Sequence, residues 1–217
     1  LKGADWFHWT GITPALSDGM AEICVLACQK AKEKNITISC DLNFRKKLWS
    51  KEKAGKVMGE LCNYIDYCIA NEEDAKDVFG IEADNTDIYG GKLDREGYIS
   101  VAKKLTERFN FKGVAITLRE SKSANDNDWS GMLYTDGQAY FSKKYSMHIV
   151  DRVGGGDSFM GGLIYGLLTY TDDDQKALNF AVAASCLKHT IFGDFNQVTV
   201  AEVENPMKGD GSGRASR

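Results

Sequence analysis

The chain has 217 residues, of which 43% are hydrophobic and 27% are charged, and its formal net charge is −4. This composition is that of an ordinary globular protein of one or two domains. The weakly acidic balance offers no basic surface for nucleic acid, and no apolar run is long enough to cross a membrane. We therefore expect a cytoplasmic protein whose partners are neither nucleic acids nor membranes.

Strand-like and helix-like segments alternate over the first half of the sequence. Strands are predicted at residues 6–11, 36–40, 64–70 and 113–118, and helices at 17–33, 50–62, 71–79 and 94–109, with a polar loop at 82–93. Ser17 is the expected N-cap of the first helix. The buried face of that helix is predicted to carry Met20, Ile23, Cys24, Ala27, Cys28 and Ala31.

The pattern changes in the second half. Residues 131–135 and 138–142 flank Asp136-Gly137, a dipeptide typical of a two-residue hairpin. Apolar helices are predicted at 158–168 and 173–190. The alternation as a whole predicts an α/β fold with a mostly parallel sheet, helices on both faces and one antiparallel hairpin. We expect one core domain over residues 1–205 and a glycine-rich tail over 206–217.

Six cysteines and three histidines are scattered along the chain. Cys24 and Cys28 lie four residues apart on a predicted helix, but no Cys-x-x-Cys pair occurs and no further ligands lie nearby. We predict buried, reduced thiols rather than a metal site.

Polar residues follow the predicted strands at their carboxyl ends. The four clusters are, in chain order, Asp41, Asn43 and Arg45; Asn71 with its acidic neighbours; Thr117, Arg119 and Glu120; and a glycine turn with Asp157. Ligands of parallel sheets bind beyond the carboxyl ends of the strands, so we expect the clusters to converge on one crevice. Each cluster also has a plainer interpretation: Arg45 suits a solvated loop, and Asn71 suits a helix N-cap.

The run Asp151-Arg-Val-Gly-Gly-Gly-Asp157 opens the apolar helix at 158–168. Glycines at a helix start let backbone N–H groups approach an anion closely. An acid in the same turn would repel phosphate, but it could take a proton from a hydroxyl that attacks a phosphoryl group. The segment therefore predicts a phosphoryl-transfer site with Asp157 as the base, although a first-turn aspartate is also favoured by the helix dipole alone.

These residues resemble the signature of the PfkB (ribokinase-like) carbohydrate kinases. The family pattern Asp-Thr-x-Gly-Ala-Gly-Asp has Arg152 and Gly155 in place of Thr and Ala here, and Asn71-Glu-Glu-Asp74 is similar to the family's Asn-x-x-Glu. The likeness is strongest to the branch that phosphorylates 2-keto-3-deoxygluconate. It rests on Trp6–Leu16, Asp41–Trp49, Leu187–Asn196 and the Gly-Asp-Gly-Ser-Gly-Arg tail.

The resemblance implies a ribokinase-like three-layer α/β/α fold, ATP and Mg²⁺ as cofactors, and phosphorylation of a sugar acid at its primary hydroxyl. Other PfkB substrates such as fructose or ribose, or a non-catalytic nucleotide-binding fragment, are the alternatives. Such kinases begin with further strands and a small β-sheet lid, so the chain resembles their C-terminal part. A homo-oligomer is expected for the full-length protein.

The resemblance also assigns roles to individual residues. Asp157 is expected to be the catalytic base, with Gly154, Gly155 and Gly156 forming the anion hole. Arg45, Asn43 and Asp194 are expected to bind the substrate. The nucleotide is expected to contact Asn71, Thr117, Arg119, Ser185 and Lys188, and Glu72 or Asp74 is expected to organise Mg²⁺ through water. Residues 117–121 read Thr-Leu-Arg-Glu-Ser, where the family often has a Thr-x-Gly-x-x-Gly run. Asp194 would also suit an ordinary turn.

Overall fold

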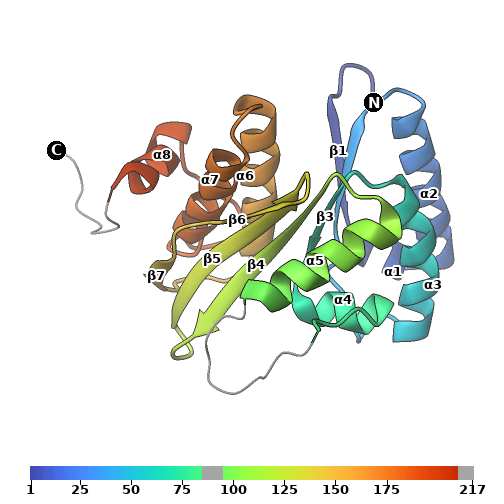
Figure 1. Cartoon of the computed structure of the whole chain (residues 1–217), viewed down its shortest axis with the longest axis horizontal. Coiled ribbons are helices and arrows are strands. Elements are labelled where there is room, and N and C mark those ends of the chain that lie inside the picture. Colours follow the sequence, from blue (N-terminus) through green and yellow to red (C-terminus); the bar gives the residue numbers. More distant parts are fainter. Residues whose placement is uncertain (85–94, 210–217) are drawn as a thin grey trace. The chain divides into compact units, whose positions relative to one another are not determined.

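A computed structural model describes residues 1–84 and 95–209 of the chain. Figure 1 labels the helices and strands of the chain. The chain divides into two compact units, which are treated separately below. The first unit contains residues 1–116 and 134–139, and the second contains residues 117–133 and 140–217. Backbone hydrogen bonds order the strands β1-β2-β3-β4-β5-β6, with β7 beside β5. In the described part of the chain no helix is long and apolar enough to span a membrane.

The first unit is built on parallel strands. These are β1 (Trp6–Thr10), β2 (Thr37–Asp41), β3 (Tyr67–Ala70) and the start of β4 (Gly113–Ser121). Between them lie α1 (Ile12–Ala15), α2 (Asp18–Lys32), α3 (Lys51–Leu61), the 3₁₀ turn η1 (Cys62–Tyr64), α4 (Glu72–Phe79) and α5 (Arg95–Phe109). The core is formed by apolar residues of these strands and of the inward helix faces, including Ile38, Cys40, Met58, Leu61 and Leu105, all fully buried.

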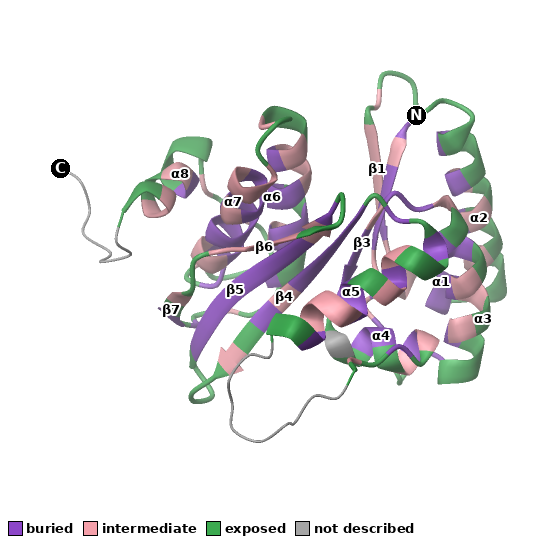
Figure 2. Ribbon diagram, viewed as in Figure 1, coloured by how far each residue is buried: buried purple, intermediate pink, exposed green. Residues whose placement is uncertain are grey.

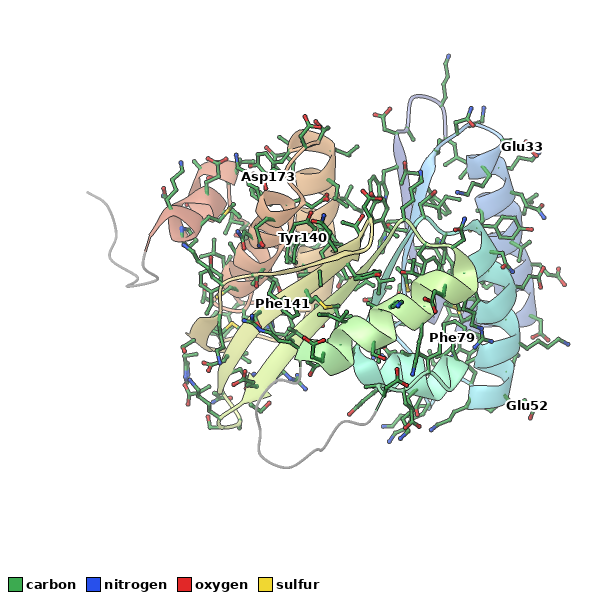
Figure 3. All side chains as sticks on the ribbon, in the orientation of Figure 1. Glu33, Glu52, Phe79, Tyr140, Phe141 and Asp173 are labelled. Carbon is green, nitrogen blue, oxygen red and sulfur yellow. The ribbon has the colours of Figure 1, made fainter. Side chains whose placement is uncertain are left out.

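Side-chain caps explain where three of these helices begin. The side chains of Ser17, Ser50 and Asn71 each accept a hydrogen bond from a backbone N–H in the first turn of α2, α3 and α4. Such caps satisfy N–H groups that have no partner within the helix. Glu33 after α2 and Glu52 in the first turn of α3 point away from the protein (Figure 3).

Asp66, just before β3, joins the starts of three strands. Its carboxylate accepts hydrogen bonds from Lys32 Nζ at 2.8 Å and from the Ile38 N–H at 2.9 Å, and it lies 3.2 Å from Lys112 Nζ. Burial opposes ionisation of this carboxyl, but the hydrogen bonds from Lys32, Ile38 and Lys112 outweigh it and lower the pKa of Asp66. The carboxylate therefore fixes the amino ends of β2, β3 and β4, opposite the ends that carry the polar clusters.

The second unit pairs β5 (Asp126–Thr135) antiparallel with β7 (Tyr145–His148) and places α6 (Gly155–Thr169) against α7 (Asp174–Lys188). Gly131 of β5 lets both helices approach, because a Cβ there would lie 3.0–3.3 Å from side chains of Val182, Phe159 and Leu178. Buried residues run along β5 and the facing sides of α6 and α7 (Figure 2). Helix α8 (Val200–Lys208) packs on α7 through Val203.

The α/β fold with a mostly parallel sheet and an antiparallel hairpin is confirmed. Asp136 and Gly137 have φ of 50° and 75° and connect β5 to β6 (Gln138–Phe141), as a two-residue hairpin turn requires. Of the predicted polar loop, residues 85–94 lie outside the described part, and so do residues 210–217 of the predicted tail.

Several local predictions need correction. The second hairpin strand is β6 and ends at Phe141, β5 begins at Asp126 rather than at residue 131, and α6 begins three residues early, at Gly155. Strand β7 and helix α8 were not predicted. Ile23, predicted on the buried face of α2, is 56% exposed. The buried residues of this helix are Cys24, Cys28 and Ala31, and they form a narrower face than predicted.

Candidate active site

The glycine turn before α6 accepts no side chain at two of its positions. Gly154 is the N-cap of α6 in the left-handed conformation, with φ of 78°. A Cβ at Gly154 would lie 2.0 Å from the Asp194 carbonyl oxygen, and a Cβ at Gly155 would lie 2.5 Å from Cε1 of His189. Glycine is thus required here by close packing as well as by backbone conformation.

Asp151 ties this turn to the loop that follows α7. Its carboxylate accepts the N–H of Val153 at 3.0 Å and that of Gly193 at 2.9 Å, and its own N–H donates to the His189 carbonyl at 3.2 Å. Hydrogen bonds from Val153 and Gly193, with smaller help from the charge of Lys188, lower the pKa of Asp151. Residues 151–154 and 189–194 are therefore joined by an ionised carboxylate.

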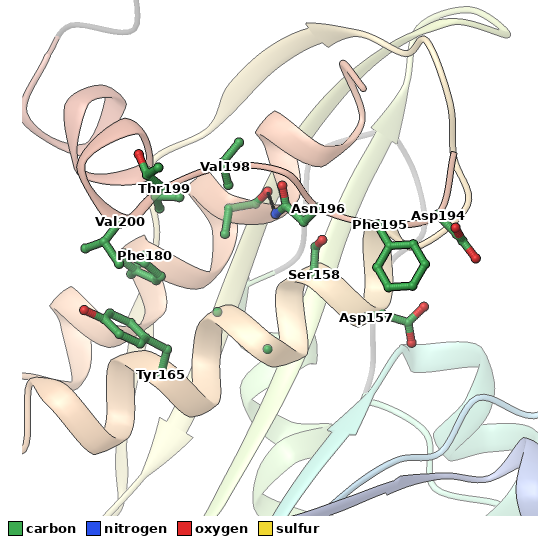
Figure 4. Close-up of a pocket in the computed structure, with 14 residues that line it drawn as sticks. Asp157, Ser158, Tyr165, Phe180, Asp194, Phe195, Asn196, Val198, Thr199 and Val200 are labelled. Carbon is green, nitrogen blue, oxygen red and sulfur yellow. Dashed lines mark hydrogen bonds between the residues drawn. The ribbon is translucent and has the colours of Figure 1, made fainter. Parts of the chain in front are cut away.

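Two carboxylates of the second unit, those of Asp157 and Asp194, line one pocket of about 540 Å³ (Figure 4). Asp157 stands in the first turn of α6 and is exposed, and Asp194 comes from the loop after α7. Figure 4 shows both side chains at the same end of the pocket, beside the ring of Phe195. The other end is apolar and is formed by Tyr165, Phe180, Val198, Val200 and Val203. The structure thus brings the predicted base and one predicted substrate residue together.

Cationic side chains surround the ring that packs on Gly155. Burial lowers the pKa of His189, against a hydrogen bond from its Nδ1 to the Ser185 carbonyl at 2.7 Å, and the charges of Lys188, Arg152 and Arg119 lower it further. The imidazole is therefore neutral near pH 7, and the positive charge at the glycine turn is carried by its lysine and arginine neighbours. Such an environment favours an anion at the helix start.

The predicted nucleotide residues of the second unit fall into two groups. Arg119 is exposed and Thr117 is half-buried on β4, so both remain candidates for ligand contact. Ser185 and Lys188 are fully buried: Ser185 Oγ donates to the Gly155 carbonyl at 2.8 Å, and Lys188 Nζ donates to the Ile191 carbonyl at 3.1 Å. Both side chains are thus turned into the protein, where they hydrogen-bond the glycine turn and its neighbouring loop. Ala183 is likewise buried in the core.

In the first unit the carboxyl ends of β1, β2 and β3 lie side by side. Gly11 N–H donates to the Asp41 carbonyl at 2.8 Å, and a Cβ at Gly11 would lie 2.0 Å from the Leu42 carbonyl oxygen. Asn43 has a positive φ of 39°, and its side-chain amide donates to Thr10 Oγ1 at 3.1 Å. The Asn43 side chain is thus held at the carboxyl ends of β1 and β2, and the convergence of the clusters on one crevice stays a prediction.

Asp74 connects the start of α4 to the loop that carries Arg45. Its carboxylate accepts the Phe44 N–H at 3.2 Å, and its own N–H donates to Asn71 Oδ1 at 2.7 Å. Burial raises the pKa of Asp74 to about 6, although the Phe44 hydrogen bond and the nearby charge of Arg45 act in the opposite direction. Asn71 is thus the N-cap of α4. Arg45 is exposed, and the side chain of Glu72 lies outside the described part of the chain. Within residues 1–84 and 95–209, no group of three or more histidine, cysteine, aspartate or glutamate side chains forms a metal site.

Sequence reasoning missed the part of the apolar end that follows α7, because it predicted no element over residues 199–205 and assigned residues 206–208 to the tail, where α8 lies. Thr199 and Glu202 form a capping box at the start of α8, and this Thr-x-x-Glu pattern is a signal that could have located the helix. It also treated Asp151 only as part of a motif. Its role in joining two loops depends on hydrogen bonds across 42 residues, which no local pattern reveals.

Two curated proteins that are similar to this chain are both named as kinases of 2-dehydro-3-deoxy sugar acids. The chain is 30% identical over 213 residues to a 2-dehydro-3-deoxygalactonokinase of Haloferax volcanii, covering 98% of this chain and 60% of that protein. It is 28% identical over 194 residues to a 2-dehydro-3-deoxygluconokinase of Thermoproteus tenax, covering 89% of this chain and 52% of that one.

A solved structure adds to this comparison. The crystal structure of 2-dehydro-3-deoxygluconokinase from Thermotoga maritima is 51% identical, with a TM-score of 0.88, over 96% of this chain and 61% of that one. The chain thus spans 52–61% of the length of these relatives. The profile of pfkB family carbohydrate kinases matches residues 1–197. The match covers nearly the whole chain, including the glycine turn and Asp157, and the chain belongs to the pfkB family of carbohydrate kinases, with a ribokinase-like α/β fold.

Proposed function

We propose that the protein transfers the terminal phosphoryl group of ATP to the primary hydroxyl of 2-keto-3-deoxygluconate, giving 2-keto-3-deoxy-6-phosphogluconate. The observation that carries the proposal is an exposed carboxylate, Asp157, one residue beyond a glycine turn at the start of a helix. Relatives named as kinases of 2-dehydro-3-deoxy sugar acids support the choice of substrate.

In this proposal Asp157 accepts the proton of the primary hydroxyl as its oxygen attacks the γ-phosphorus of ATP. The O–P bond to the sugar forms while the bond between the γ-phosphorus and the bridging oxygen breaks, and ADP leaves. Backbone N–H groups of Gly154, Gly155 and Gly156 and the positive end of α6 stabilise the charge of the transferred group. Lys188, Arg152 and Arg119 strengthen this positive potential.

Arg45 and Asp194 are the proposed substrate residues. A guanidinium offers the forked pair of donors that a carboxylate accepts, and Arg45 is exposed at a strand-end cluster. Asp194 shares the pocket with Asp157 and would accept hydrogen bonds from substrate hydroxyls. Asn43 completes the set of proposed polar contacts, and Thr117 and Arg119 are the proposed nucleotide contacts.

Magnesium is expected to come with the ATP phosphates. Asn71 Oδ1 and one Asp74 oxygen already accept backbone N–H groups, so these residues fit contact with the ion through its waters better than direct ligation. Asn71 and an acid at position 72 or 74 would then orient the hydrated ion. When bound, the ion would neutralise charge on the phosphates.

The test of the base is Asp157→Asn in the full-length protein. Asparagine keeps the size of the side chain but cannot accept the proton, so we expect kcat to fall by about 10³-fold while ATP binding is nearly unchanged. A coupled assay measures turnover and calorimetry measures ATP binding. Turnover within a few-fold of the wild-type value would exclude Asp157 as the base.

The test of the substrate class is Arg45→Ala. Losing a charge-assisted pair of hydrogen bonds should raise KM for the sugar acid by about 10- to 100-fold with little change in KM for ATP. Arg45→Lys is the matched control, because it keeps the charge without the forked pair of donors. Its KM for the sugar acid should lie between those of the wild-type protein and Arg45→Ala.

A substrate panel completes the test. It compares 2-keto-3-deoxygluconate, 2-keto-3-deoxygalactonate, gluconate, fructose and ribose. Preference for a neutral sugar, together with an unchanged KM in Arg45→Ala, would contradict a carboxylate substrate.

A further inference from the structure

Lys188, the last residue of α7, is a fully buried cation. Among the hydrogen bonds of the described residues, its ammonium has one acceptor, the Ile191 carbonyl at 3.1 Å. A buried ammonium with so few partners is costly, and lysine is rarely found fully buried for packing alone. The position therefore calls for a role that needs the charge.

The hydrogen bond from Lys188 to the Ile191 carbonyl holds the loop that shapes the glycine turn. Ile191 lies in the 189–194 loop, whose Gly193 N–H donates to Asp151 and whose Asp194 carbonyl occupies the space where Gly154 would carry a Cβ. The loop is also bound at its start, where the His189 carbonyl accepts the Val150 N–H at 2.8 Å. A shift of Ile191 would consequently be passed to Gly154 through direct contacts.

The charge of Lys188 also acts on ionisable groups beside the glycine turn. It is one of the groups that keep Asp151 ionised, and with Arg152 and Arg119 it disfavours a proton on His189 beside Gly155. In a water-excluded setting a fixed charge interacts more strongly than one in solvent. A phosphate at the start of α6 would experience the same field.

We propose that Lys188 is an internal cation that positions the anion hole: its ammonium holds the 189–194 loop against the glycine turn and adds positive potential behind the transferred phosphoryl group. The inference rests on the proposed kinase function. It assigns Lys188 as a positioning residue, with no direct contact to substrate or nucleotide.

The first experiment is Lys188→Met in the full-length protein, which keeps the volume of the side chain and removes the charge and the donor. We expect kcat to fall at least about 10-fold, as loss of support for an oxyanion site does, with the sugar KM little changed. Lys176→Met on the same helix is the matched control and should leave kcat unchanged, because Lys176 lies on the ring of Tyr170, away from the turn.

The second experiment is chemical rescue of Lys188→Ala, whose cavity can admit a small cation. Ammonium or methylammonium should restore kcat in a saturable way, whereas tetramethylammonium, which has no N–H donor, should not. Lys188→Met should not respond, because methionine fills the site. A purely structural role would lower the melting temperature without cation-specific recovery of kcat.

The outcomes separate this inference from the proposed function. If wild-type protein fails to phosphorylate any sugar acid of the panel, the proposed function is wrong. If wild-type turns over and folded Lys188→Met has the same kcat, or if Lys188→Ala shows no cation-specific rescue, the role of Lys188 is wrong and the kinase function stands.

Discussion

Gly154 shows at the scale of one residue how tightly the proposed anion site is specified. Its φ of 78° disfavours any side chain, and the Asp194 carbonyl independently excludes a Cβ. Sequence could indicate that a glycine is needed before α6, because glycines at helix starts suit anion binding. It could not reveal the second constraint, since Asp194 is 40 residues further along the chain.

Gly154→Ala should therefore damage both stability and activity. We expect a loss of about 3 kcal/mol in the free energy of unfolding and a fall in kcat of at least about 10², because either the backbone or the Asp194 loop must move. Gly59→Ala in α3 is the control: a Cβ there meets nothing within 4 Å, and alanine should leave stability unchanged or raise it by up to about 1 kcal/mol. Urea unfolding and the coupled assay measure both effects. Equal stability of the two variants would contradict the close-packing argument.

The sequence also did not show which residues of α7 are buried and which are exposed. Ser185 and Lys188 were predicted to contact the nucleotide, yet both side chains point inward. The helix is apolar on nearly every side, so its pattern did not distinguish a buried polar residue from a ligand contact. Asp157 and Asp194, by contrast, line one pocket, and the sequence had marked each of them separately, by a motif and by a turn signal.

At the scale of elements, the Ser17 cap and the Asp136-Gly137 pair located the start of α2 and the β5–β6 turn from the sequence. Ser17, Asn71 and Asp173 each precede a helix and cap it. Strand β7 escaped prediction because it has only four residues, too few for the alternation of Tyr145 and Met147 with the exposed Ser146 and His148 to stand out. Short strands are defined by their partners more than by their own residues.

Asp66 acts at this scale, since one carboxylate joins the starts of β2, β3 and β4. Asp66→Asn removes its pairing with Lys32 and Lys112 and should lower the free energy of unfolding by about 2 kcal/mol at pH 7. Because the folded-state pKa of Asp66 is lowered, its stabilisation is present above the unfolded value of 3.8 and is lost as pH falls through the folded value.

The stability difference between wild-type protein and Asp66→Asn should therefore shrink as pH falls below about 4. Urea titrations at pH 7, 4 and 3 measure it. Asp18→Asn, which removes an exposed pairing with Lys53, should leave stability unchanged. A difference for Asp66→Asn that grows toward acid pH would contradict the assignment.

At the scale of the whole molecule, all six cysteines are free; five of them are buried, as predicted, and Cys186 is half-buried. Burial raises the pKa of Cys28 to about 12 and that of Cys186 to about 11. Thiolate is the reactive form, so folded protein should react very slowly.

Labelling with iodoacetamide at pH 7.5, followed by mass spectrometry, should show at most slow modification of Cys186 in native protein. All six cysteines should be modified in 8 M urea. Fast native labelling of Cys24, Cys28, Cys40, Cys62 or Cys68 would show that the first unit opens far more often than its packing implies.

The carboxylate of Asp151 has a consequence for engineering. Because it binds the segments 151–154 and 189–194 at once, the two behave as a single part although 34 residues separate them. A chimera that imports the 189–196 loop from another kinase to change sugar preference would break this joint unless the 151–157 segment came with it. Substrate preference in this scaffold should therefore be exchanged as a pair of matched segments, with Lys188 retained between them.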